Sequence, residues 1–203
     1  MKKIIILLNA SIQRSVITFL CIFLLGISCK KEKSAVAPPP TETSIFTNQI
    51  PTGQTLNDSI GGIELGLKFQ SAVAGNIEGI KFFKTPGNIG THTGQLYASD
   101  GTLLASAVFT NETDSGWQSV LFAAAIPIAA ETTYIAAYHS SLGNYISTAY
   151  GLKTAITNGT LTALADSTED GINGLYKYTS APAFPDNGFH SSNYWVDVIE
   201  VDK

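Results

Sequence analysis

The clearest pattern in the chain is an alternation of apolar with polar or small residues along residues 63–70. The apolar positions are Ile63, Leu65, Leu67 and Phe69. Successive side chains of a β-strand point to opposite faces, so this period of two predicts a strand with one face in a hydrophobic core. Glu64 belongs to the other face, and we expect it to face solvent, as we do Glu78.

Further strand-like segments recur at short spacing. They lie at residues 80–83, 94–98, 103–109, 117–122, 126–128, 134–139 and 194–201. The dipeptide Asp100-Gly101 favours a hairpin because it tolerates positive φ, and Pro127 indicates an edge strand because proline has no N–H for the ladder. No segment has a helical period. The sequence therefore predicts an all-β fold, a two-sheet antiparallel β-sandwich that is jelly-roll-like.

Aromatic residues within these segments are candidates for the core. We expect Trp117 and Trp195, which lie on strand segments, to be buried between the sheets. Tyr134 and Tyr138 share one face of their strand, which we assign to the core. By the same parity His139 points to the opposite face.

Residues 140–193 differ from the rest because they are rich in glycine and tyrosine and show no sustained alternation. Loops on a rigid scaffold often carry binding residues, so we predict a shallow ligand-binding surface from residues 138–150 and 174–194. Its predicted members are His139, Tyr145, Tyr176, Tyr178, Asn193 and Tyr194, and His92 in the preceding part of the chain is the next candidate. The alternative is that the tyrosines pack in the core and that His139 is structural.

The N-terminus has the layout of a bacterial lipoprotein signal. Three basic residues and no acidic one precede Cys29, and residues 16–25 are almost purely apolar. That run is shorter than the about 20 residues that span a bilayer, and small residues follow it, as in a signal peptide. We predict that residues 1–28 are a signal peptide and that Cys29 carries the lipid. The alternative is an uncleaved anchor helix over residues 4–27.

Two regions are predicted after the signal. Residues 29–52 form a flexible tether, in which Pro38-Pro39-Pro40 favours an extended spacer, and residues 53–203 form a single β-sandwich domain. Lys30, rather than an acidic residue, follows the lipidated cysteine. The predicted location is therefore the cell envelope, with the outer membrane favoured over the inner membrane.

Charge and cysteine content narrow the possible partners. The chain has 12 Lys and Arg against 16 Asp and Glu, and removal of residues 1–28 takes away three basic residues, which leaves a net charge of −7. This charge opposes nucleic-acid binding, which depends on Lys and Arg. Cys21 would leave with the signal peptide. The mature domain then has no disulfide and must depend on its apolar core.

Five short motifs stand in order over residues 54–201. They are Gly-Asn-Ile-Gly-Thr-His-Thr-Gly at 87–94, Gly-Trp-Gln at 116–118, Thr-Tyr at 133–134, Tyr-His at 138–139 and Asn-Tyr-Trp-Val-Asp at 193–197. As a set they resemble the bacterial family known as domain of unknown function 4082. The resemblance implies an extracellular β-sandwich module without an established active site, with sugar binding as the expected role.

The residues give little sign of catalysis. The three histidines lack metal-binding spacing, no Gly-x-Ser-x-Gly elbow occurs, and nothing pairs two carboxylates as a glycosidase requires. We therefore expect a protein that is not an enzyme and has no cofactor or catalytic metal. Structural calcium is the one ion considered, at the oxygen-rich loops 169–171 and 186–188.

These observations favour a membrane-anchored, non-catalytic binding module whose partner is a glycan or polysaccharide. The alternative is a structural or adhesion lipoprotein that binds a protein partner, and a hydrolase is a distant third. An exposed aromatic row would favour sugar binding, whereas a flat apolar patch would favour a protein partner.

Replacement of the predicted lipid-bearing cysteine tests the anchor. Cys29→Ser should move the protein out of the membrane fraction, because the chain would lack the acyl groups that hold it there. Fractionation and labelling with radioactive palmitate measure this. The lipoprotein prediction is wrong if the variant stays with the membrane and the wild type takes up no label.

Overall fold

A computed structural model describes residues 41–58, 61–167, 169 and 171–201. The predicted signal peptide, Cys29 and the first part of the tether lie outside the described residues. The part of the chain that the structure describes contains no helix with the length and hydrophobicity needed to cross a membrane.

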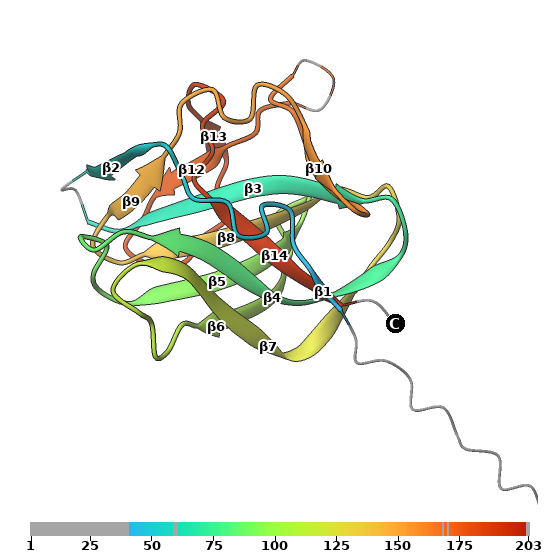
Figure 1. Cartoon of the computed structure of the whole chain (residues 1–203), viewed down its shortest axis with the longest axis horizontal. Coiled ribbons are helices and arrows are strands. Elements are labelled where there is room, and N and C mark those ends of the chain that lie inside the picture. Colours follow the sequence, from blue (N-terminus) through green and yellow to red (C-terminus); the bar gives the residue numbers. More distant parts are fainter. Residues whose placement is uncertain (1–40, 59–60, 168, 170, 202–203) are drawn as a thin grey trace, which may run out of the picture. The chain divides into compact units, whose positions relative to one another are not determined.

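The described residues form antiparallel sheets that pack as a β-sandwich, which confirms the predicted fold class (Figure 1). A four-stranded sheet has the order β1 (Glu42–Thr43), β14 (Val196–Val201), β4 (Gly75–Lys84) and β7 (Gly116–Ile128). An eight-stranded sheet has the order β10 (Ile156–Asn158), β11 (Leu161–Ala163), β3 (Ile63–Ser71), β8 (Tyr134–Ser140), β5 (His92–Ala98) and β6 (Leu103–Val108). In the same sheet β12 (Leu175–Tyr178) pairs with β3 and with β13 (Asn187–Gly188), and a separate pair joins β2 (Gln54–Asn57) to β9 (Asn144–Ser147).

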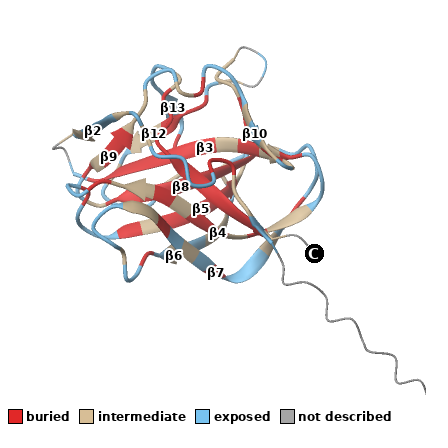
Figure 2. Ribbon diagram, in the orientation of Figure 1, coloured by how far each residue is buried: buried red, intermediate tan, exposed pale blue. Residues whose placement is uncertain are grey.

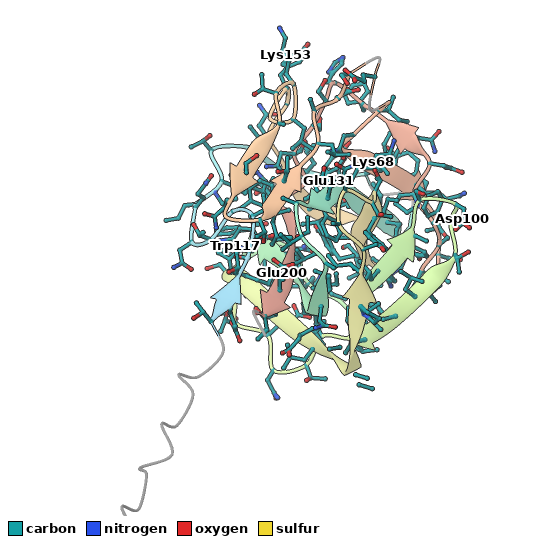
Figure 3. All side chains as sticks on the ribbon, turned by 90° about the vertical axis from the view of Figure 1, so that its right-hand side faces the viewer. Lys68, Asp100, Trp117, Glu131, Lys153 and Glu200 are labelled. Atoms are coloured by element: carbon teal, nitrogen blue, oxygen red, sulfur yellow. The ribbon has the colours of Figure 1, made fainter. Side chains whose placement is uncertain are left out.

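The core lies between the two large sheets, where side chains fill the space between the ribbons (Figure 3). The four alternating apolar residues of β3 are all buried, as predicted. Tyr134 and Tyr138 are buried as well, and the ring of Tyr138 stacks on Phe82 of the opposite sheet with centroids 4.3 Å apart. The period of two therefore identified the inner face correctly.

Strand β7 forms the edge of the four-stranded sheet, as Pro127 indicated. The sequence suggested two short strands here, but the structure has one continuous strand of 13 residues. Its register against β4 shifts between Ile77 and Gly79, and this irregularity joins the two halves. Much of β7 is exposed (Figure 2).

The folded part begins earlier than predicted, because residues 42–50 belong to the sandwich and not to the tether. Strand β1 pairs with β14, and Ile45 and Phe46 are buried in the core. The buried carboxylate of Asp197 accepts the backbone N–H groups of both residues, at 2.8 and 2.9 Å. The predicted domain start at residue 53 was therefore too late by about ten residues.

Phe46 packs against both tryptophans, which also contact each other and differ in burial. Its ring centroid lies 5.3 Å from that of Trp195 and 6.3 Å from that of Trp117. Trp195 is buried, as predicted, whereas Trp117 is only partly buried and donates its indole N–H to Gln49 O at 2.9 Å. Trp117 therefore lies at the margin of the core.

Glu64 corrects the prediction for the outer face of β3, because its side chain is fully buried. The segment 179–188 covers this face, and Phe184 packs there on a small second apolar cluster that includes Tyr97 and Leu175. One carboxylate oxygen of Glu64 accepts the Ala183 N–H at 3.4 Å, and the other has no partner among the described residues. Burial raises the pKa of Glu64 from 4.5 to about 9.

Asn173 braces the other edge of β3 where its two neighbours separate. Strand β11 pairs with β3 from Phe69 onward and β12 pairs with it up to Gly66, so Lys68 lies in the gap. The buried amide of Asn173 fills the gap, because its Oδ1 accepts the Lys68 N–H at 2.8 Å and its Nδ2 donates to Lys68 O at 3.0 Å. The same amide also donates to Leu164 O at 2.7 Å.

Loss of this brace should destabilise the domain. We expect Asn173→Ala to lower the free energy of unfolding by about 3 kcal/mol, since buried backbone groups would lose their partners. Urea unfolding measures the change. As a control, Asn76→Ala on partly exposed β4 should change the free energy of unfolding by less than about 1 kcal/mol. Equal effects of the two substitutions would contradict the bracing role.

Glu64 should make the stability depend on pH. Between about 4.5 and about 9 the unfolded chain ionises this carboxyl while the folded chain retains the proton, so the free energy of unfolding falls as the pH rises through that range. Glu64→Gln should flatten this fall, and Glu78→Gln, on partly exposed β4, should not. Urea unfolding at a series of pH values across this range measures the slope. The assignment of the pH dependence to Glu64 is wrong if the free energy of unfolding falls equally steeply in Glu64→Gln and in wild type.

Candidate functional site

One end of the sandwich carries an open groove of about 700 Å³, where β2, β9 and β12 lie close together (Figure 1). We call it the aromatic groove. The described residues that line it are Thr52, Gly53, Gln54, Leu56, Asp58, Tyr145, Ser147, Thr148, Ala149, Tyr176, Tyr178, Phe189, His190, Ser192 and Tyr194. Its volume lies in the usual range for ligand sites, about 300–1,000 Å³.

The floor of the groove is built by the tyrosines of two segments. Tyr145 on β9 is 7% exposed and Tyr194 is 5% exposed, and their rings meet edge to face with centroids 5.7 Å apart. Strand β2 is drawn close against β9 because Gly53 has no side chain. A Cβ at Gly53 would lie 2.2 Å from Ser147 O.

Strand β12 supplies the wall and part of the rim. Tyr176 is partly buried, Tyr178 is 49% exposed, and their centroids lie 5.4 Å apart. The strand follows Gly174, which has a φ of +74°, and a Cβ there would lie 2.0 Å from Ser192 O. Glycine at this position therefore lets β12 pass directly against the segment that carries Tyr194.

That segment, residues 189–195, is held by a backbone bridge and by strained turns. Thr148 and Asn193 exchange two backbone hydrogen bonds, both of 2.9 Å, and Asn193 Oδ1 accepts the Trp195 N–H at 2.8 Å. His190 has a positive φ of 52°, which is costly for a residue with a side chain. This turn places the rings of Phe189 and His190 at the rim, stacked at 3.8 Å.

Asp58 is the acidic group of the groove. Its Oδ2 accepts the hydroxyl protons of Tyr145 at 2.8 Å and of Tyr178 at 3.0 Å. Burial and then the hydrogen bond to Asp58 raise the pKa of both tyrosines, and burial raises the pKa of Tyr194 to about 12. The hydroxyls therefore remain protonated at neutral pH.

The structure brings four of the seven predicted binding residues together, since Tyr145, Tyr176, Tyr178 and Tyr194 all line the groove. Asn193 is buried beside it and positions the 189–195 segment instead of lining the groove.

The two predicted histidines lie elsewhere. His139 is buried on the outer face of β8, where its Nε2 donates to Thr179 O at 3.0 Å. His92 is fully buried, with Nδ1 2.9 Å from the Glu112 carboxylate and Nε2 2.8 Å from Asn88 Oδ1. Burial lowers the pKa of His92 against the opposing effect of Glu112.

The 87–94 motif thus contributes a buried polar network. Asn88 Oδ1 also accepts the Ser140 hydroxyl at 3.1 Å, and Lys84 pairs with Glu112 at 2.8 Å. These contacts tie the motif to β8 and to the loop before β7, which gives its polar residues a structural role.

The sequence analysis did not place Asp58 or Gln54 in the predicted surface, and it did not name Phe189 and His190 among its members. Asp58 and Gln54 carried no sequence signal because β2 was not predicted. Phe189 and His190 lie within the predicted 174–194 segment, so the segment was right although these two residues were not named.

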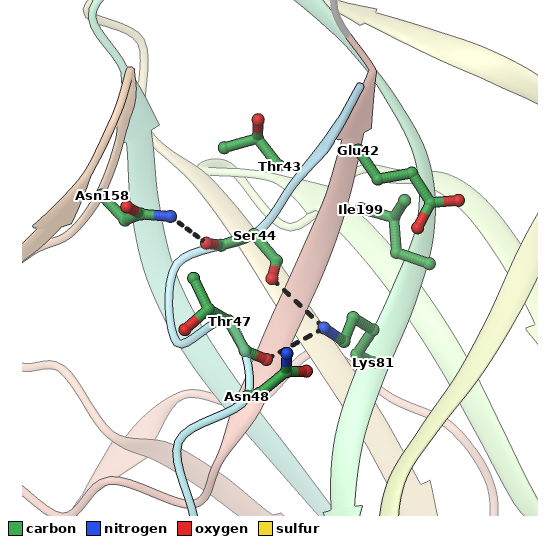
Figure 4. Close-up of a pocket in the computed structure, with 8 residues that line it drawn as sticks. All are labelled: Glu42, Thr43, Ser44, Thr47, Asn48, Lys81, Asn158 and Ile199. Atoms are coloured by element: carbon green, nitrogen blue, oxygen red, sulfur yellow. Dashed lines mark hydrogen bonds between the residues drawn. The ribbon is translucent and has the colours of Figure 1, made fainter. Parts of the chain in front are cut away.

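A smaller pocket of about 300 Å³ lies beside the N-terminal segment (Figure 4). Lys81 is the one basic residue among its described lining residues, and the Lys81 ammonium donates to Ser44 Oγ at 3.2 Å and to Thr47 O at 3.3 Å. The same ammonium lies 5.1 Å from the centroid of Trp117. Because these contacts hold the N-terminal segment in place, we assign this pocket a structural role.

The described residues contain no group of three or more His, Cys, Asp or Glu side chains arranged to hold a metal ion. In the 186–188 loop, which we considered for calcium, the carboxylate of Asp186 instead accepts the Lys177 ammonium at 2.8 Å. Asp170 of the other loop lies outside the described residues.

The fold and the groove define a class of protein, an antiparallel β-sandwich with an aromatic groove at one end. Residues 48–196 match the family described as domain of unknown function (DUF4082), and the chain belongs to that family. This confirms the resemblance in the sequence motifs. No curated protein matches the chain significantly.

Proposed function

We propose that this protein is a non-catalytic carbohydrate-binding module of the bacterial cell envelope. The observation that carries the proposal is the aromatic groove, where four tyrosine rings lie beside amide, hydroxyl and carboxylate groups. Apolar ring faces suit the C–H faces of a sugar, and a few placed polar groups suit its hydroxyls. The groove is open, which suits a chain-like ligand.

The non-catalytic part of the proposal rests on the acids of the groove. Asp58 is the one carboxylate among the described lining residues. Glycosidases use two carboxyl groups that flank the scissile bond, about 5–10 Å apart. The arrangement therefore favours binding over hydrolysis.

A protein partner is less well supported. Large exposed apolar side chains sit on several separate elements and loops of the described chain, for example Val73, Leu121 and Leu142. A scattered distribution of this kind is normal for a monomer surface.

Membrane anchoring is the second part of the proposal and depends on the sequence of residues 1–29. A single sugar site of this kind binds weakly, since one stacked ring contributes about 1 kcal/mol. Many copies on one membrane would compensate through avidity. Weak binding by each single site is therefore compatible with a role for the membrane-anchored protein.

A glycan array probed with the full-length chain in detergent tests the binding role. We expect binding to one class of glycan, and we expect Tyr178→Ala and Tyr176→Ala each to weaken it by about five-fold, the equivalent of about 1 kcal/mol. Both variants should keep the fold, because neither ring is fully buried.

Leu121→Ala provides the control, because Leu121 is 57% exposed and lies on β7, away from the groove. It should bind like wild type. Absence of binding to any glycan, or an equal loss in the Leu121 variant, would overturn the proposal. Thermal unfolding of each variant distinguishes lost binding from lost folding.

A further inference from the structure

The end of the aromatic groove around Asp58 presents an unusual set of hydrogen-bonding groups. Tyr145 and Tyr178 both donate their hydroxyl protons to Asp58 Oδ2. A phenol has a single proton to donate. Each of these hydroxyls can therefore only accept a hydrogen bond from a ligand.

Asp58 itself adds a further acceptor. Both tyrosines bind Oδ2, and no hydrogen bond from a described residue reaches Oδ1. An ionised carboxylate has no proton of its own. The site around Asp58 thus offers three acceptor atoms, Oδ1 and the two tyrosine oxygens, without a donor among them.

The charge of this site is negative and is not balanced locally. The described lining residues include Asp58 but no Lys or Arg. Lys177, the nearest basic residue in sequence to the groove wall, pairs with Asp186 instead. The faces of the tyrosine rings add negative electrostatic potential, which attracts cations.

A sugar hydroxyl matches this site poorly because it supplies one proton. An N-acetyl group supplies one N–H and brings a carbonyl oxygen, which would face other acceptors. An ammonium group supplies three N–H donors and a positive charge. It matches both the number of acceptors and the charge.

We infer that the ligand of the aromatic groove is an amino sugar whose free ammonium group binds Asp58, Tyr145 and Tyr178. This inference rests on the proposed function and names the class of sugar. Among the other lining rings, Tyr176 on β12 and the exposed Phe189 at the rim provide apolar surface for the sugar ring.

Three β-1,4-linked hexamers that differ only at C2 test the inference. They are the glucosamine hexamer, the N-acetylglucosamine hexamer and the glucose hexamer. With the full-length chain in detergent, calorimetric titration should show that the glucosamine hexamer binds at least about ten-fold more tightly than either neutral hexamer. This difference is expected for charge-assisted hydrogen bonds. Added salt should weaken this preference.

Asp58→Asn should abolish the preference. The asparagine oxygen can still accept the tyrosine protons, but the amide presents N–H groups in place of an acceptor and carries no charge. Asp114→Asn is the matched control, because it removes the same charge from an exposed residue outside the groove lining. It should keep the preference, and Tyr178→Phe should reduce it while retaining the ring.

The outcomes separate this inference from the proposed function. If either neutral hexamer binds as tightly as the glucosamine hexamer, or if Asp114→Asn acts like Asp58→Asn, the amino-sugar inference is wrong. If a neutral glycan binds in the groove on the array and the glucosamine hexamer does not bind, the inference falls and the proposed function stands. If no glycan of any kind binds, both fall.

Discussion

The amide of Asn173 is the contact on which the shape of the candidate site depends. Strands β11 and β12 both pair with the same edge of β3. Where these two strands separate, the Asn173 side chain forms hydrogen bonds to the backbone N–H and carbonyl of Lys68. Its Oδ1 also accepts the N–H of Gly174 at 2.7 Å, directly before β12 begins. The side-chain amide thus replaces a missing strand residue and fixes the start of β12, which carries two rings of the groove.

The groove combines a rigid floor with an exposed rim. Tyr145 and Tyr194 are held in the fold and expose only a small part of their surface to the groove, whereas Tyr178 and Phe189 are about half exposed. Asp58 connects the two levels, because it accepts one hydroxyl from the floor and one from the rim. A site arranged in this way loses little conformational freedom when a ligand binds, which favours recognition by a small contact area.

The sequence predicted those features that repeat locally and missed those that depend on distant segments. The alternation in residues 63–70 located the inner face of the sandwich, and the density of tyrosines located much of the groove. Burial of Glu64 could not be predicted, because the segment that covers it lies more than 100 residues away. The early start of the fold was missed for the same reason, since Ile45 and Phe46 bind Asp197 across about 150 residues. Asn88 and His92 of the 87–94 motif are buried together, a role that the sequence alone does not reveal.

We propose that the aromatic groove is where this protein binds its ligand. Backbone amide chemical-shift mapping of the full-length chain, titrated with the tightest-binding glycan, tests it most directly. We expect the largest shifts in residues 52–58, 145–149, 176–178 and 189–194, with little change on β6 and β7. Shifts concentrated on β6 and β7, or around Lys81, with the groove unchanged would contradict it.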